Sequence, residues 1–116
     1  MTPAKLKDFL VEILKEKKIG DITVIDVASK TTIADYFIIV SGKNGPQVSS
    51  LCEHLEEKAE EKGIFVTRKE GVREARWVVM DYSSVLVHIF NDDTRDFYCL
   101  EKLWSDAESN NITIVN

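Results

Sequence analysis

The amino-acid sequence predicts an α/β domain, in which helices pack on a mixed sheet of about five strands. Two segments repeat apolar residues at helical steps of three and four, and several others are short apolar runs bounded by turn residues. Because the two kinds of segment alternate along the chain, we expect them to share one layered fold. A chain of 116 residues has the length of one domain with a single core. We expect this domain to cover residues 1–108 and a C-terminal tail to cover residues 109–116.

Each of the two long helices is predicted from a proline in its first turn and from a glycine at its end, and Thr2 can cap the first of them. The first begins at Thr2 and Pro3 and stops at Gly20. The second begins at Asn44-Gly45-Pro46 and stops at Gly63. The apolar stripe of the first helix consists of Leu6, Phe9, Leu10, Ile13 and Leu14. The stripe of the second consists of Val48, Leu51, Cys52, Leu55 and Ala59.

The strands are predicted at residues 22–27, 35–42, 64–69, 77–81 and 85–90. The run at 35–42 is the densest and is typical of a central strand that is covered on both faces. The last two runs are separated only by Tyr82-Ser83-Ser84, so they are expected to pair as a hairpin. After the hairpin we expect a short helix from residues 92–94 to about Lys102, and the stretch Ile112–Val115 then trails off.

A two-residue loop at Ser83-Ser84 sets a register in which Trp77 pairs with Phe90 and Val79 with His88. One face of the hairpin is then almost entirely apolar, with Val78, Met80, Tyr82, Val85, Val87 and Ile89. The other face combines aromatic and polar side chains, with Trp77, Val79, Asp81, Leu86, His88 and Phe90. Such a combination is typical of a binding surface. Alternatively, a helix covers this face and His88 is a core histidine. A loop of three residues would change the register of the hairpin and mix the two faces.

The charge and the apolar runs exclude several classes of partner. Lys and Arg number 15 against 20 Asp and Glu, a net charge of −5, so we expect no binding to RNA through bulk charge. The sequence shows neither a signal peptide nor an apolar run of membrane-spanning length, so we expect a cytoplasmic protein with no membrane partner. Cys52 and Cys99 lack the spacing of a metal site and are expected to be free thiols.

The sequence contains no motif that specifies catalysis. The segment Ser41-Gly42-Lys43-Asn44-Gly45 has only a slight likeness to a phosphate-binding loop, and no two acids alternate along a strand to share magnesium. Asp81, His88 and a nucleophile can be combined into a triad on paper, but a nucleophile motif is missing. We therefore expect no catalytic residue, no cofactor and no metal site.

Six segments, taken in order and with their spacing, resemble the Iojap family, whose bacterial members are ribosomal silencing factors. They are residues 21–27, 35–42, Glu70-Gly71, 77–82, 85–90 and 95–104. The resemblance extends from about Leu6 to Ala107. It implies a fold similar to nucleotidyltransferases but without their catalytic acids, and hence a binding protein.

The resemblance also implies a partner and a mechanism. Family members bind the large ribosomal subunit through its fourteenth protein, block joining of the small subunit and repress translation when nutrients are limiting. Two alternatives stay open: a large-subunit assembly factor that uses the same docking site, and a nucleotidyltransferase-like enzyme. A homodimer is plausible from the family and from the apolar stretch Ile112–Val115, which could cover a second copy.

Seven of the residues that match the family pattern are expected to bind the ribosomal protein: Trp77, Asp81, Tyr82, His88, Glu70, Arg95 and Tyr98. Trp77 and His88 are expected to make direct contacts, and the carboxylates of Asp81 and Glu70 to pair with basic groups. Arg95 and Tyr98 are expected to flank this surface. Leu103 and Trp104 are expected to anchor the final helix to the core.

Overall fold

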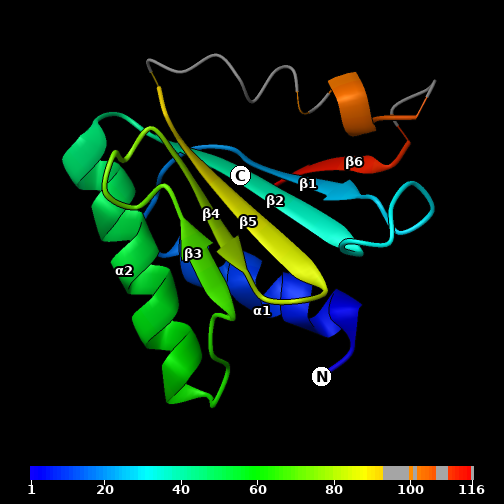
Figure 1. Ribbon diagram of the computed structural model, residues 1–116, viewed down its shortest axis with the longest axis horizontal. Coiled ribbons are helices and arrows are strands. Elements are labelled where there is room, and N and C mark those ends of the chain that lie inside the picture. Colours follow the sequence, from blue (N-terminus) through cyan, green and yellow to red (C-terminus); the bar gives the residue numbers. More distant parts are fainter. Residues whose placement is uncertain (93–99, 101, 107–109, 116) are drawn as a thin grey trace.

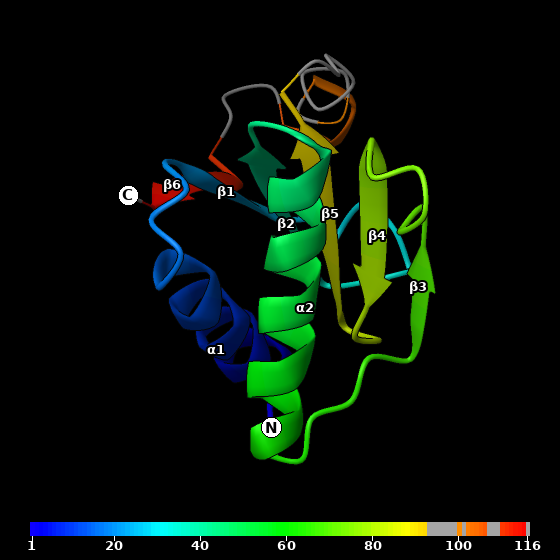
Figure 2. The same cartoon turned by 90° about the vertical axis from the view of Figure 1, so that its left-hand side faces the viewer.

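The computed structural model describes residues 1–92, 100, 102–106 and 110–115. They form a six-stranded sheet with the strand order β3-β4-β5-β2-β1-β6, and helices α1 and α2 lie together against one of its faces (Figures 1 and 2). β2 and β5 run parallel, and the other neighbouring pairs are antiparallel. The predicted class, a mixed sheet with helices packed on it, is confirmed, with β6 as an additional strand.

The bounds follow the predicted ones closely for α2, for the start of α1 and for the hairpin. The elements are α1 (Pro3–Lys15), β1 (Ile22–Asp26), β2 (Tyr36–Gly42), α2 (Gly45–Glu61), β3 (Arg68–Glu70), β4 (Trp77–Asp81), β5 (Val85–Asn91) and β6 (Ile112–Val115). Both predicted helix starts are confirmed, because the Thr2 hydroxyl accepts a hydrogen bond from the Lys5 amide at 3.2 Å and the Asn44 side chain accepts one from the Gln47 amide at 2.9 Å.

The two helices end differently. α2 ends next to Gly63, whose φ of +76° is the left-handed conformation that terminates a helix, as predicted. α1 ends at Lys15, before the predicted stop at Gly20. Beyond Lys15 the amides of Lys17 and Lys18 donate to carbonyls three residues back, so the last turn tightens and the helix does not continue to the glycine.

The helices and one face of the sheet enclose the larger core. The predicted stripe of α2 is buried throughout, and α1 buries Val11 beside four residues of its predicted stripe. The sheet contributes Ile22, Val24, Ile38, Val40, Val78, Met80, Tyr82, Val85, Val87 and Ile89 to this core. This face of the hairpin is therefore the apolar one.

The strand predicted at 64–69 is shorter and lies later, at Arg68–Glu70. Ile64 and Val66 precede it as a loop that packs against the helix-side core. The reason is the length of its partner: Arg68 pairs with Asp81, the last residue of β4, so no further residue of β4 is available to pair with an earlier start.

A second, smaller core lies on the opposite face of the sheet, with Ile25, Val27, Ala34, Phe37, Ile39 and Phe90. Leu100, Trp104 and Ile112 pack against it, and the rings of Trp104 and Phe37 meet edge to face at 5.3 Å. Trp104 thus anchors the chain to the core as predicted. Leu103 does not, since it is 72% exposed: a helical turn that directs Trp104 to the sheet directs its neighbour away. Residues 93–99 and 101 of the predicted last helix lie outside the described residues.

The prediction that residues 109–116 form a tail is wrong for Ile112–Val115, which form β6 and pair antiparallel with β1. Asn111 secures the start of this strand. Its side-chain amide donates to the carbonyls of Asp26 at 3.0 Å and Trp104 at 2.8 Å, and its own carbonyl accepts from the Asp26 amide at 2.9 Å. The stretch is therefore an integral strand of the sheet, and it is not free to cover a second copy as a tail would.

Candidate functional site

The hairpin of β4 and β5 has the predicted register. Trp77 pairs with Phe90 and Val79 with His88, and the Tyr82 amide donates to the Val85 carbonyl at 2.9 Å across a two-residue turn. Ser83 adopts the positive φ of +71° that a tight hairpin turn requires, and its amide donates to the Asp81 carboxylate at 2.7 Å. The sequence-based division of the hairpin into two faces is therefore confirmed.

Helices α1 and α2 cover the apolar face and leave the aromatic and polar face uncovered, so the part of the alternative that places one of them on this second face is wrong. Its other part is confirmed, because His88 is a buried histidine with a hydrogen-bond partner. Side chains of β3 add to this uncovered face, because Arg68 pairs with Asp81 and Glu70 with Val79. We call the resulting surface the Trp77 face; it consists of Arg68, Glu70, Trp77, Val79, Asp81 and Leu86. Trp77 is 41% exposed there, which is unusual for so large an apolar ring.

A shallow pocket of about 170 Å³ lies on the Trp77 face. Its walls combine three apolar and three charged side chains: Ile33, Val79, Leu86, Arg68, Glu70 and Asp81. The Arg68 guanidinium lies 3.8 Å from the Glu70 carboxylate and 3.5 Å from the Asp81 carboxylate. The lining of the pocket thus combines an apolar surface with two carboxylates and one guanidinium.

Two residues of this pocket, Ile33 and Arg68, were missed by the sequence-based interpretation. Arg68 falls inside the predicted strand 64–69, where no face could be assigned to it without a known partner. Ile33 is an exposed isoleucine in the loop between β1 and β2. An isolated apolar residue after the polar run Lys30-Thr31-Thr32 was the only available signal in the sequence.

His88 lies beneath Trp77 and not on the surface. It is 5% exposed, and its Nδ1 accepts a hydrogen bond from the Trp77 indole Nε1 at 3.1 Å. The rings of Phe37 and Phe90 pack around it at 5.0 and 6.4 Å between centroids. Because burial among these rings penalises the charged form, the pKa of His88 falls to about 4 and the imidazole is neutral. His88 is thus not positioned to make the direct contacts with the ribosomal protein that were expected from the sequence.

The burial of His88 predicts how the stability of the protein depends on pH. In the unfolded chain His88 takes up a proton near pH 6.5, whereas in the folded chain it does so only near pH 4. The unfolded state therefore binds more protons between these values, and the folded state loses about 3 kcal/mol of stability as the pH falls from 7 to 4. Urea unfolding of the wild type and of His88→Leu across this range measures the effect, since titrating carboxylates contribute equally to both. Parallel stability curves would contradict a neutral buried histidine.

Tyr82 is separated from the other predicted site residues. It is 4% exposed and lies in the helix-side core, and burial raises the pKa of its phenol well above the usual range. The family-like segments of the hairpin include residues of both faces of the sheet. Because side chains alternate between the faces along a strand, Tyr82 lies on the face opposite Trp77. Of the other predicted residues, Glu70 is exposed and Asp81 half-buried on the Trp77 face, and Arg95 and Tyr98 lie outside the described residues.

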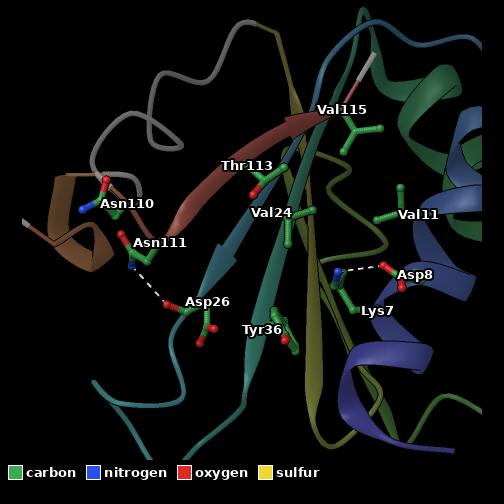
Figure 3. A pocket seen from close by; sticks show the side chains of 10 residues that line it. All are labelled: Lys7, Asp8, Val11, Val24, Asp26, Tyr36, Asn110, Asn111, Thr113 and Val115. Atoms are coloured by element: carbon green, nitrogen blue, oxygen red, sulfur yellow. Dashed lines mark hydrogen bonds and ion pairs between the residues drawn. The ribbon is translucent and has the colours of Figure 1, made fainter. Parts of the chain in front are cut away.

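A larger pocket of about 300 Å³ lies on the helix side of the sheet, between α1 and the strands β1, β2 and β6 (Figure 3). The Lys7 ammonium pairs with Asp8 at 2.7 Å and lies 5.2 Å from the centre of the Tyr36 ring. The Asn111 amide that holds β6 to Asp26 forms another part of the lining (Figure 3). None of the predicted site residues that the structure describes lines this pocket. Within the described ranges, no three His, Cys, Asp or Glu side chains are grouped to hold a metal ion, and no helix is long and apolar enough to cross a membrane.

Comparison with known proteins identifies the relatives of this fold. The family model described as "ribosomal silencing factor during starvation" matches residues 2–116. The ribosomal silencing factor RsfS of Bacillus subtilis is 42% identical over 92 residues, 79% of this chain and 78% of that protein. That of Halalkalibacterium halodurans is 37% identical over 107 residues, 92% of each chain. A crystal structure of a Chromobacterium violaceum protein aligns with a TM-score of 0.83 at 29% identity, covering 90% of this chain and 87% of that one.

More distant relatives carry other names. The mouse protein "mitochondrial assembly of ribosomal large subunit protein 1" is 30% identical over 84% of this chain and 44% of its own length. The chloroplastic Iojap protein of Arabidopsis thaliana is 29% identical over 84% of this chain and 41% of its own length. The resemblance to the Iojap family is thereby confirmed. A family match over nearly the whole chain, together with bacterial relatives above 30% identity, places this protein: it belongs to the ribosomal silencing factor family.

Proposed function

We propose that this protein binds the large ribosomal subunit through its fourteenth protein and so blocks joining of the small subunit, repressing translation when nutrients are limiting. The observation that carries the proposal is the Trp77 face, which lies on the side of the sheet that α1 and α2 leave uncovered and on which a half-exposed tryptophan is held in place. Large aromatic side chains of this kind supply much of the binding energy of protein interfaces, because they bury a large area at a small cost in side-chain entropy.

The charge of the molecule supports a protein partner over RNA. With a net charge of −5, the chain is repelled by phosphates and attracted to a basic protein surface. Glu70 and Asp81 place two carboxylates in the lining of the pocket on the Trp77 face, where they can pair with basic side chains of the partner. Arg95 and Tyr98 remain proposed flanking contacts.

The proposed mechanism is steric. A domain with extents of 35 × 33 × 24 Å, bound to the surface of the large subunit that meets the small one, occupies space that the joined subunits need. No bond is made or broken in this mechanism, so the chain acts as a regulator without catalysis. Formation of a homodimer stays a prediction. β6 is an edge strand of the sheet, and its outer edge would face the second copy.

Sedimentation of purified ribosomal subunits tests the proposal. Added protein is expected to sediment with the large subunit and to reduce the fraction of joined ribosomes in proportion to its occupancy. Raising the salt concentration is expected to weaken this binding, because charged side chains contribute to it. If the protein neither sediments with the large subunit nor changes the joined fraction, the proposal is wrong.

The name of the mouse relative favours a second candidate, a factor that assists assembly of the large subunit. The same Trp77 face would then bind the ribosomal protein on an incomplete particle. A strain that lacks the protein separates the two functions. Accumulation of large-subunit precursors during growth supports assembly, whereas normal subunits with unrestrained translation under starvation support silencing.

A further inference from the structure

We propose that His88 is a positioning residue for docking: its neutral imidazole holds the indole of Trp77 in one orientation on the exposed face. This inference rests on the proposed function, since it assigns Trp77 to the contact with the ribosomal protein. It differs from the expectation drawn from the sequence, in which His88 itself touches the partner. Its tests include measurements on the free protein that do not depend on ribosome binding.

Trp77 is held by a hydrogen bond and by a stacking contact. An exposed tryptophan on a strand can adopt several rotamers, and each alternative reduces the population that is ready to bind. Here the indole Nε1 donates to His88 Nδ1 at 3.1 Å, and the ring stacks on Phe90 at 5.2 Å with an interplanar angle of 22°. The stacking contact alone leaves the ring free to turn over on Phe90, whereas the hydrogen bond selects one edge of the indole.

His88 is itself held in place by the packing around it. It is buried in the middle of β5, next to the central strand β2, where it pairs with Ile39. Its ring meets Phe37 edge to face at 5.0 Å, and Phe37 in turn meets Trp104 at 5.3 Å. A continuous set of packed rings therefore connects the smaller core to the exposed indole, so the position of Trp77 is determined by the core.

Packing alone does not explain a histidine at position 88. Because Nδ1 accepts from Trp77, the proton of the neutral ring is on Nε2. That nitrogen is buried and has no hydrogen-bond partner in the described part of the chain. A buried donor without a partner costs free energy, and a leucine or phenylalanine among these rings would avoid that cost. What the imidazole adds is the acceptor that Trp77, whose indole only donates, requires.

Two substitutions at position 88 separate this role from packing. His88→Leu removes the acceptor and keeps an apolar side chain in the core. His88→Asn keeps an acceptor oxygen close to the position of Nδ1. In the free protein, the indole N–H signal of Trp77 in a ¹⁵N-resolved NMR spectrum is assigned by its loss in Trp77→Phe. We expect His88→Leu to shift this signal and to speed its exchange with water, and His88→Asn to preserve most of its protection.

Binding to purified large subunits provides the second readout. We expect His88→Leu to weaken binding about five- to tenfold, the equivalent of one neutral hydrogen bond, and His88→Asn to restore much of it. In a Trp77→Phe background, which lacks the indole N–H, His88→Leu is expected to have no further effect. A purely structural role would weaken binding equally in both backgrounds and would overturn the proposal.

The two hypotheses fail in different ways. If wild-type protein does not bind the large subunit, the proposed function is wrong and His88 has no role in docking. The NMR signal of the free protein still shows whether His88 holds Trp77 in one orientation. If wild-type protein binds but His88→Leu leaves both the indole signal and the affinity unchanged, the positioning role is wrong and the proposed function stands. Thermal unfolding of each variant confirms that the comparison is made on folded protein.

Discussion

Replacing Trp77 by alanine is expected to weaken binding to the large ribosomal subunit by about 30- to 1,000-fold, the range for loss of a central aromatic contact worth roughly 2–4 kcal/mol. The side chain is half-exposed, is held by His88 and Phe90, and lies on the same face of the sheet as a pocket lined in part by two carboxylates. It thus combines the large apolar area and the preorganisation that make a dominant contact. The affinity is measured by titrating labelled protein with purified large subunits.

Phe65→Ala is the matched control for this substitution. Phe65 is also an exposed aromatic residue, but it lies in the loop between α2 and β3. This loop leads to the start of β3, which pairs with the last residue of β4, whereas Trp77 is the first residue of β4 (Figure 2). Its removal is expected to leave the affinity within about twofold, as for most surface positions outside a contact centre. Equal losses for the two variants, or no loss for Trp77→Ala, would show that the Trp77 face is not the docking surface.

Replacing Gly71 by alanine is expected to destabilise the protein by about 3–5 kcal/mol. Gly71 follows β3 with φ +77°, a left-handed conformation that costs other residues roughly 1–2 kcal/mol. In addition, a Cβ atom at this position would lie 2.2 Å from the carbonyl oxygen of Trp77. Since backbone cannot yield as a flexible side chain does, either β4 or the loop of residues 71–76 must move. Urea unfolding measures the loss of stability.

Gly63→Ala separates the two contributions. Gly63 has nearly the same φ, +76°, but a Cβ there would meet nothing within 4 Å. Its loss of stability is therefore expected to be the left-handed cost alone, roughly 1–2 kcal/mol. The difference between the two variants then measures the clash with Trp77. Equal destabilisation would mean that the backbone around Gly71 adjusts freely, and that the close approach does not help to place Trp77.

The hairpin shows what local sequence patterns can predict. Its register follows from the turn at Ser83-Ser84, and strand alternation then assigns each side chain to a face, so both features depend only on neighbouring residues. The helix starts at Thr2 and Asn44 are local in the same sense. The shared face of Trp77 and Asp81 was therefore predictable, although Glu70 joins it only through the pairing of β3 with β4.

The other predicted site residues show where such patterns stop. Tyr82 and His88 lie within the same family-like segments as Trp77, yet one is buried under the helices and the other beneath the indole. A motif identifies positions along the chain, but exposure depends on what packs against each position from elsewhere. The rings of Phe37 and Trp104 that help to bury His88 come from β2 and from the C-terminal segment, far from the hairpin in sequence.

Local patterns predicted the α/β class, the starts of both helices and the hairpin register, because each of these depends on residues close together along the chain; the ordered motifs carried the resemblance to the Iojap family. The packing of the domain established which face of the sheet the helices cover, that Ile112–Val115 complete the sheet as β6, and that His88 supports Trp77 from below. These outcomes depend on contacts between segments far apart in sequence, whose favourable burial appears only once the whole domain has formed.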